Sequence, residues 1–352
     1  ALVERALMGG DCLNVGCVPS KAIIRAARAA AACRDAARFG ITLPQPPRAD
    51  FAEVMARMRR LRAAISPHDS ARRFQQLGVD VFFGQAEFAG AQLLRVIDGE
   101  GTVRELPFRR AVIATGARAA APEIPGLAEV PYLTNETLFS LTTLPASLGV
   151  IGGGPIGCEM AQTFARLGSR VTLVEKASQI LSREDPDAAA VVQRQFEQDG
   201  VQVILEASQL KVTRQDSPAI ALSLAQAGVP RPIAVDQLLV AAGRTPNIEG
   251  LNLQAAGVTH DRRGVHVDDY LRTSNPRIFA AGDVCSRYKF THAADFQARI
   301  VVQNALFALG PLGRKRVSRL LIPWATYTSP EVAHVGSYPG EAAAAGLAID
   351  TY

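Results

Sequence analysis

The sequence predicts an α/β fold in which short strands alternate with helices. Apolar segments of strand length alternate with longer segments of helical periodicity, a pattern typical of parallel sheets covered by helices. The clearest unit has a strand at 148–151, a Gly-rich turn, a helix at 155–167 and a strand at 171–175. The length of 352 residues predicts two or three domains, since domains typically contain about 100–200 residues.

The remaining elements follow from the same patterns in chain order. The expected helices are 17–38, 51–77, 155–167, 186–199 and about 292–308. The expected strands are 79–83, 111–115, 148–151, 171–175, 201–205, 237–242 and 278–283. Residues 319–352 begin a new pattern of short extended runs.

Composition and charge exclude several classes of protein. A hydrophobic content of 48% and scattered glycines exclude a disordered or collagen-like chain. No apolar run reaches the roughly 18 residues of a membrane span, and no signal peptide is visible, so we expect a cytoplasmic protein. The net charge of +5 is carried by dispersed arginines, which argues against nucleic-acid binding. The densest cluster indicates a solvated helix face, with a docking surface as the alternative: Arg57, Arg59, Arg60 and Arg62.

The five cysteines fall into two groups. An odd number of cysteines without a signal peptide argues against a secreted disulfide scaffold. Cys33, Cys158 and Cys285 stand alone beside small or apolar residues, and we expect them to be buried, inert thiols. No Cys/His cluster has the spacing of zinc ligands, so no metal site is predicted.

The strongest local signal is the segment 9–21, which reads Gly-Gly-Asp-Cys-Leu-Asn-Val-Gly-Cys-Val-Pro-Ser-Lys. A disulfide between Cys12 and Cys17 would restrain the unfolded chain by only roughly 2 kcal/mol, so a stabilising crosslink is a poor reason for it. Redox exchange suits such a tight loop better. Cys17 starts a helix, whose unpaired N–H groups favour a thiolate, and Lys21 adds positive potential one turn later. Two structural thiols are the alternative.

The second signal is the Gly-rich turn after the strand 148–151. Its three glycines have the spacing that lets a dinucleotide pyrophosphate approach helix N–H groups, and the expected contacts are Gly152, Gly154, Pro155, Ile156 and Gly157. Glu175 ends the next strand, where its carboxylate can accept hydrogen bonds from a ribose diol and would repel a 2′-phosphate. NADH is therefore favoured over NADPH, although the neighbouring Lys176 leaves NADPH open. A turn without a ligand is the alternative.

A faint internal repeat links the Gly-rich unit to the start of the chain. Thr172-Leu-Val-Glu175 has the same form as Ala1-Leu-Val-Glu4 at the start of the chain. If the two are equivalent, the chain begins at the second strand of an earlier nucleotide-binding unit.

The segment 12–21 closely resembles the redox motif of the flavin-dependent pyridine nucleotide-disulfide oxidoreductases (class I). The family includes dihydrolipoamide dehydrogenase, glutathione reductase and mercuric reductase, and the resemblance covers essentially the whole chain. It implies that Cys12 and Cys17 form a redox disulfide, in which Cys12 exchanges with substrate and Cys17 contacts the flavin. It also implies that Lys21 lies near the reactive flavin nitrogen, paired with Glu159.

The same resemblance implies FAD and NADH or NADPH as cofactors. Glu4 would bind the adenosine ribose of FAD, and Asp283, in Ala281-Gly-Asp, the ribityl chain. The stretch Ala114-Thr-Gly matches the turn beside the flavin, and His292 is expected at the helix near the pyrimidine ring, more in a positioning than in a catalytic role. The expected set of cofactor contacts is completed by Ala86, Thr115, Gly116, Gly243 and Thr291.

The resemblance also implies a domain order of two Rossmann-like domains, with the NAD(P) domain at 119–246 inserted into an FAD domain at 1–118 and 247–318. Residues 319–352 would start an α+β dimerisation domain of a homodimer. We expect the chain to be truncated at both ends. The missing parts would be the first flavin-binding strand with its Gly-rich turn, and most of the dimerisation domain.

Within the family, the sequence is most similar to the mercuric reductase-like subgroup. Pro155 and Ser20 stand where glutathione reductases carry a gating aromatic residue and a second lysine, which argues against that subgroup. The implied partner is a disulfide or dithiol substrate, of small-molecule or protein nature, or Hg(II). Dihydrolipoamide dehydrogenase is the alternative within the family, and a non-catalytic nucleotide-binding fragment is the alternative of another class.

Overall fold

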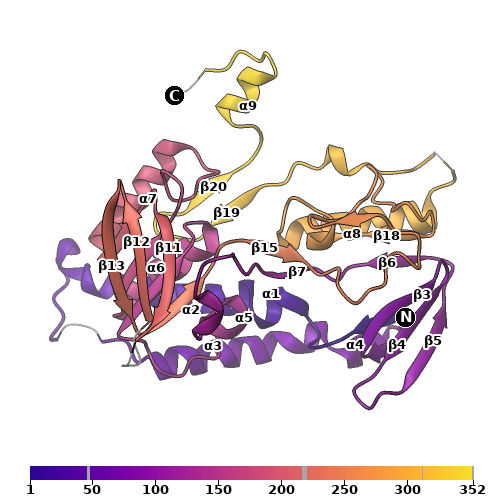
Figure 1. The fold of residues 1–352 in the computed structure, drawn as a ribbon, viewed down its shortest axis with the longest axis horizontal. Helices are drawn as coiled ribbons and strands as arrows, with labels where there is room; N and C mark the ends of the chain where they lie inside the picture. Colours follow the sequence, from indigo (N-terminus) through magenta and orange to yellow (C-terminus); the bar gives the residue numbers. More distant parts are fainter. Residues whose placement is uncertain (46–47, 216–219, 311, 351–352) are drawn as a thin grey trace. The chain divides into compact units, whose positions relative to one another are not determined.

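The structure is a computed structural model that describes residues 1–45, 48–215, 220–310 and 312–350 (Figure 1). The chain forms two compact units, which are described separately. Unit 1 comprises Ala1–Asn14, Ala64–Arg118 and Arg244–Ile322. Unit 2 comprises Val15–Ala63, Ala119–Gly243 and Pro323–Tyr352. Strands and helices alternate in both units, so the predicted α/β class is confirmed.

Unit 2 is built on a four-stranded parallel sheet in the order β10-β9-β8-β14. Its strands are β8 (Ser147–Ile151), β9 (Arg170–Val174), β10 (Val201–Ile204) and β14 (Gln237–Val240). Its helices are α2 (Cys17–Arg34), α3 (Phe51–Ile65), α5 (Asn135–Leu138), α6 (Pro155–Leu167), α7 (Pro186–Gln198) and α9 (Pro339–Ala344). The predicted βαβ unit around the Gly-rich turn is thus present.

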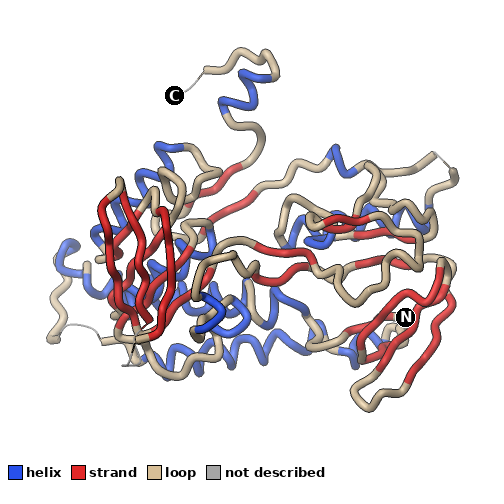
Figure 2. The backbone as a smooth tube through the Cα atoms, viewed as in Figure 1, coloured by secondary structure: helices blue, strands red, loops and turns tan. Residues whose placement is uncertain are grey.

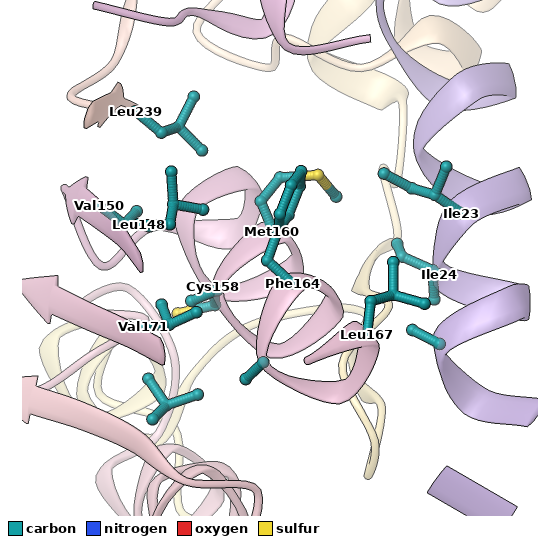
Figure 3. Close-up of a cluster of buried hydrophobic side chains, with 14 of the residues drawn as sticks. Ile23, Ile24, Leu148, Val150, Cys158, Met160, Phe164, Leu167, Val171 and Leu239 are labelled. Carbon is teal, nitrogen blue, oxygen red and sulfur yellow. The ribbon is translucent and has the colours of Figure 1, made fainter. Parts of the chain in front are cut away.

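The core of unit 2 lies between this sheet and α2. Figure 3 shows Phe164 and Met160 projecting from α6 between Leu148 and Val150 of β8 and Ile23 of α2. All five side chains are at most 1% exposed. Because such a site cannot collapse fully, Phe164→Ala should destabilise the fold by about 3–5 kcal/mol. This packing explains why the segment containing α2 belongs to unit 2.

Unit 1 combines several two-stranded sheets with one three-stranded antiparallel sheet. Strands β1 (Leu2–Glu4) and β2 (Val81–Phe83) pair in parallel, as do β6 (Ala111–Ile113) and β18 (Ile278–Ala280). Its other strands are β7 (Ala117–Ala119), β15 (Arg244–Pro246), β16 (His260–Asp261) and β17 (Gly264–Val265). Its helices are α1 (Gly10–Asn14), α4 (Ala71–Gln76) and α8 (Thr291–Val302).

Two three-stranded antiparallel sheets were not predicted (Figure 2). One contains β3 (Gln85–Gly90), β4 (Leu93–Ile97) and β5 (Val103–Pro107). The other contains β11 (Ser208–Arg214), β12 (Ile220–Gln226) and β13 (Val229–Val235). Their outer strands β5 and β13 are mostly exposed, so the apolar alternation that marks a strand is weak in each.

The predicted helix 51–77 is wrong as a single element. Helix α3 ends at Ile65, a 3₁₀ turn spans Ser66–Asp69, and α4 restarts after Ser70, whose side chain accepts a hydrogen bond from Arg73 N. Pro67 explains the break, because proline cannot donate the backbone hydrogen bond of a helix interior. The predicted helix 292–308 likewise continues beyond Val302 only as one π-helical turn, Gln303–Phe307.

The described residues contain four more short 3₁₀ segments. Three of them connect larger elements, and the last one named here follows β18. They are Ala36–Phe39, Leu127–Glu129, Val317–Arg319 and Gly282–Val284. Residues 319–352 were predicted as short extended runs, and they contain the antiparallel pair β19 (Trp324–Thr326) and β20 (Val332–His334) as well as α9.

The compact units depart from the predicted segments in two places. Residues 15–63 group with 119–243, because α2 packs on α6, and residues 323–352 join the same unit. The units also divide between residues 118 and 119 and between 243 and 244. Which unit binds which cofactor remains a prediction.

The arginine cluster of α3 is not purely a solvated face. Arg57 donates to Ala22 O at 3.3 Å, and Arg59 donates to Leu141 O at 3.1 Å. Both side chains therefore connect α3 to other parts of unit 2. Over the described residues, no helix combines the length and apolar character that crossing a membrane requires.

Candidate active site

The segment that carries Cys12 lies in unit 1 and is held by its own hydrogen bonds. Cys12 is half-buried in α1, and Asn14 Nδ2 donates to Met8 O at 3.0 Å and to Gly10 O at 2.9 Å. Gly9 has φ +88°, and a Cβ there would lie 2.4 Å from the Leu13 side chain. The turn before α1 therefore requires glycine.

Cys17 is the first residue of α2 in unit 2 and is exposed. Residues in the first helical turn have backbone N–H groups without intrahelical partners, and the helix dipole is positive there. Such a position favours a thiolate over a thiol. The prediction that Cys17 starts a helix is confirmed, whereas its disulfide with Cys12 stays a prediction.

Lys21 and Glu159 form the predicted ion pair, although 137 residues separate them in the sequence. Lys21 Nζ lies 3.1 Å from Glu159 Oε1 and 2.9 Å from Oε2. Glu159 is only 5% exposed, and its Oε1 also accepts a hydrogen bond from Tyr327 N at 2.9 Å. The carboxylate is buried with both a countercharge and a donor, as a buried charge requires. The pair places a fixed positive charge one helical turn after Cys17.

The Gly-rich turn between β8 and α6 has the geometry of a pyrophosphate cradle. Gly152 has φ +107°, and a Cβ on Gly157 would lie 1.9 Å from Gly152 O, so both positions require glycine. Around Gly154 a Cβ would meet nothing within 4 Å. Pro155 opens α6, and Ile156 is partly exposed beside it. The turn therefore leaves room at Gly154 in front of the helix N–H groups.

Glu175 follows β9 and reaches back to this turn. Its Oε2 accepts a hydrogen bond from Gly153 N at 2.5 Å, and its Oε1 accepts one from Ala177 N at 2.9 Å. The Glu175 carboxylate is therefore held against the Gly-rich turn, and its contact with a nucleotide ribose stays a prediction.

The residues predicted to contact the flavin lie mainly in unit 1. Thr115 Oγ1 donates to Asn247 O at 2.7 Å, and Gly116 has a positive φ of 69° at the following position. Asp283 is mostly buried, and burial raises the pKa of its carboxyl group, while the charge of Arg244 lowers it. Within the described residues, no hydrogen bond or ion pair links Glu4 to Thr115 or to Asp283.

The remaining predicted contacts are at scattered positions. Ala86 is half-buried in β3, opposite Val96 of β4. Gly243, in unit 2, has φ +114°. Thr291 is the first residue of α8, and the His292 ring stacks on Phe290 with centroids 5.5 Å apart.

Sequence reasoning missed Arg244, which forms an ionic cluster in unit 1. Its guanidinium contacts the carboxylate of Asp11 next to Cys12, lies 3.4 Å from Asp283 Oδ2 and donates to Ala117 O at 2.7 Å. The Arg244 side chain is 13% exposed, so its guanidinium is largely removed from water, whereas the Asp11 side chain is 37% exposed. The signal that could have found it is an arginine directly after Gly243 at a strand end.

The isolated cysteines are only partly as predicted. Cys158 is fully buried and donates to Gly153 O at 3.2 Å, and burial raises its pKa strongly. Burial also raises the pKa of Cys285, to about 12. The prediction for Cys33 is wrong, because this residue is exposed near the end of α2. Within the described ranges, no group of three or more His, Cys, Asp or Glu side chains could hold a metal ion.

Comparison with known proteins points to one family. The family model described as "Pyridine nucleotide-disulphide oxidoreductase" matches residues 1–298. A mercuric reductase of Streptomyces lividans is 37% identical over 351 residues, which cover 99% of this chain and 73% of the relative. A dihydrolipoyl dehydrogenase of Chlorobaculum tepidum is 33% identical over 350 residues, with coverage of 99% and 73%.

Relatives and solved structures agree on the fold. A mercuric reductase of Staphylococcus aureus is 33% identical over 352 residues, but the chain spans only 62% of its length. The HOCl-induced flavoprotein disulfide reductase RclA from Escherichia coli, in its Cu(II) complex, superimposes with a TM-score of 0.84 at 30% identity. The superposition covers 98% of this chain and 73% of that structure, so the Rossmann-like architecture extends over nearly all of this chain.

Proposed function

Because the chain belongs to the pyridine nucleotide-disulphide oxidoreductase family, we propose that it is an FAD-dependent enzyme that reduces a disulfide or Hg(II) with a pyridine nucleotide. The observation that carries this proposal is the Lys21–Glu159 ion pair one turn after Cys17. A helix N-terminus and a held ammonium group both stabilise a thiolate at that position. A thiolate is the form of cysteine that exchanges with disulfides and binds metal ions.

The residues present fit the two cofactors. In unit 2 the open space at Gly154 and the strict glycines at 152 and 157 suit a dinucleotide pyrophosphate. In unit 1 the carboxylates of Glu4 and Asp283 can accept hydrogen bonds from the hydroxyl groups of FAD. When bound, FAD would take two electrons from the nicotinamide and supply them to the Cys12–Cys17 disulfide.

The chain's own residues then carry out the exchange. Cys12 sulfur attacks a substrate disulfide, forms a mixed disulfide and releases one thiol. Cys17 attacks Cys12, restores their disulfide and releases the second thiol. With Hg(II), both thiolates would bind the metal ion; the two electrons then pass from the sulfurs to mercury, so that the Cys12–Cys17 disulfide forms again and Hg(0) leaves. Glu159 holds the Lys21 ammonium group one helical turn after Cys17.

Glu175 supports NADH as the preferred nucleotide. Its carboxylate is fixed by two backbone N–H groups at the end of β9, so a 2′-phosphate at this point would meet a fixed negative charge. A ribose diol could instead donate hydrogen bonds to the same oxygens. We further propose that the full-length protein is a cytoplasmic homodimer, as is expected for this family.

A test of the proposal compares two cysteine variants of the FAD-loaded chain. Cys12→Ser should abolish NADH oxidation that depends on Hg(II) or on an aromatic disulfide, whereas Cys33→Ser should leave it unchanged. Equal loss in both variants would contradict the assignment of Cys12. A chain that binds nucleotides but never oxidises NADH would favour the non-catalytic alternative. Preferential oxidation of dihydrolipoamide with formation of NADH would favour the dihydrolipoamide dehydrogenase alternative.

A further inference from the structure

The Lys21–Glu159 pair has a third member that the sequence did not indicate. The ring centroid of Tyr327 lies 4.5 Å from Lys21 Nζ, and Tyr327 N donates to Glu159 Oε1 at 2.9 Å. All three residues belong to unit 2. Tyr327 therefore contacts both charges of the pair, the ammonium through its ring and the carboxylate through its backbone.

The backbone around Tyr327 is fixed independently of the ring. Arg28 of α2 donates to Tyr327 O at 3.2 Å and to Thr328 O at 3.0 Å. Gln162 of α6 exchanges two hydrogen bonds with Ser329, each 2.8 Å long. Replacing the Tyr327 side chain should therefore leave the segment, and the N–H donated to Glu159, in place.

The ring occupies a side of Lys21 that would otherwise face water. The Lys21 side chain is 37% exposed, whereas that of Glu159 is 6% exposed, so the lysine is the partner that meets water. An aromatic face attracts an ammonium group through its quadrupole, most strongly where water is partly excluded. The ring thus limits the positions that the ammonium can adopt.

We propose that Tyr327 is a positioning residue whose ring holds the Lys21 ammonium against Glu159, so that the charge beside Cys17 stays at one place. The contact between ring and lysine stands on the structure alone. Its consequence for electron transfer rests on the function proposed above.

The test measures the lysine directly in the full-length chain without added flavin. Each variant is exposed to an amine-reactive reagent at fixed pH, and the labelling rate of Lys21 is followed by peptide mass spectrometry. Tyr327→Leu removes the aromatic face but keeps an apolar side chain, and should raise the Lys21 rate about two- to fivefold. Tyr327→Phe retains the ring and should restore the wild-type rate. Lys176, also in unit 2, serves as the internal reference and should not change.

Equal Lys21 rates in the wild type, Tyr327→Leu and Tyr327→Phe would overturn the proposal. So would a parallel rise at Lys176, because it would show general loosening of unit 2. A second readout uses the FAD-loaded protein, in which Tyr327→Leu should lower the midpoint potential of the flavin and Tyr327→Phe should not. If labelling changes as expected but the potential does not, the local role of Tyr327 stands and the proposed place of Lys21 beside the flavin fails.

Discussion

Two strands of this molecule share the sequence Leu-Val-Glu at their ends: β1 ends at Glu4, and Glu175 directly follows β9. The first hydrogen bond of each carboxylate is the same. At the end of β1 in unit 1, Glu4 Oε1 accepts a hydrogen bond from Ala6 N at 2.9 Å. After β9 in unit 2, Glu175 Oε1 accepts one from Ala177 N, also at 2.9 Å. Each strand also pairs in parallel with a later strand of its own unit. The repeat seen in the sequence is therefore a repeat of local structure.

The second carboxylate oxygen distinguishes the two regions. Glu175 Oε2 accepts a hydrogen bond from Gly153 N, which belongs to the turn after β8. Among the contacts of the described residues, the Glu4 carboxylate accepts only the hydrogen bond from Ala6 N. A strand sequence thus sets the first contact of its terminal carboxylate, whereas a neighbouring Gly-rich turn sets the second. The Glu175 carboxylate is therefore held by two backbone N–H groups, and the Glu4 carboxylate by one.

The largest expected effect is on how fast iodoacetamide alkylates the thiols near the two regions. Cys158 lies under the Gly-rich turn of unit 2, and Cys285 lies close to Asp283 in unit 1. Burial raises the pKa of Cys285 to about 12, which lowers the fraction of the reactive thiolate at pH 8. Alkylation of the native protein by iodoacetamide should therefore spare both thiols and modify the exposed Cys33. Rapid modification of Cys158 would show that the turn opens to solvent.

Two glycine variants separate folding of the turn from nucleotide binding. Gly157→Ala would force a Cβ to 1.9 Å from Gly152 O and should destabilise unit 2 by about 1–3 kcal/mol, with loss of NADH binding. Gly154→Ala meets nothing within 4 Å, so it should fold normally. If the pyrophosphate lies at Gly154, this variant should nevertheless bind NADH at least about tenfold more weakly. Thermal unfolding and NADH titration distinguish these effects, and normal NADH binding by Gly154→Ala would contradict the placement of the pyrophosphate.

Replacing Glu4 and Glu175 by glutamine, one at a time, tests whether the two strand ends serve different nucleotides. Glu175→Gln should weaken NADH binding about tenfold through loss of charge-assisted hydrogen bonds, while NADPH binding should hold or improve. Glu4→Gln should weaken FAD binding and leave NADH binding unchanged. Calorimetric titration of both variants with both cofactors checks this. If the two variants gave the same pattern, the two strand ends would not serve different nucleotides.

The smallest expected effect concerns the stability of unit 1. A hydrogen bond from Arg118 lowers the pKa of Glu249 from 4.5 to about 2. A carboxyl group with a lowered folded-state pKa stabilises the fold above its ordinary pKa, and this stabilisation is lost as the pH falls towards 2. Because the pair is exposed, Glu249→Gln should cost less than about 1 kcal/mol at pH 7. The cost should shrink between pH 4.5 and 2 in denaturant titrations, and a cost that stayed constant over this range would contradict the account.

Local sequence predicted the parts of the site whose geometry is local. The Gly-rich turn, the start of α2 at Cys17 and the bounds of α6 follow from glycine spacing, a helix N-terminus and apolar periodicity. Contacts between residues more than 100 positions apart were not predicted, as Tyr327 and Arg244 show. Neither residue belongs to a periodic pattern that indicates its partner. The Lys21–Glu159 pair was predicted only through resemblance to a family.

The sequence also failed to predict which side chains the fold buries. Cys33 has small apolar neighbours like those of a core position, yet it lies on the exposed side of α2. The outer strands β5 and β13 carry too few buried side chains to show the alternation of a strand. In both cases the missing information is which face the rest of the fold covers.

The visible spectrum of the FAD-loaded chain tests the central claim most directly. Addition of NADH should produce long-wavelength absorbance from the Cys17 thiolate beside the flavin. The band should be absent in Cys17→Ser and retained in Cys33→Ser. A band that persisted in Cys17→Ser, or a flavin-loaded wild type that showed none, would contradict the account.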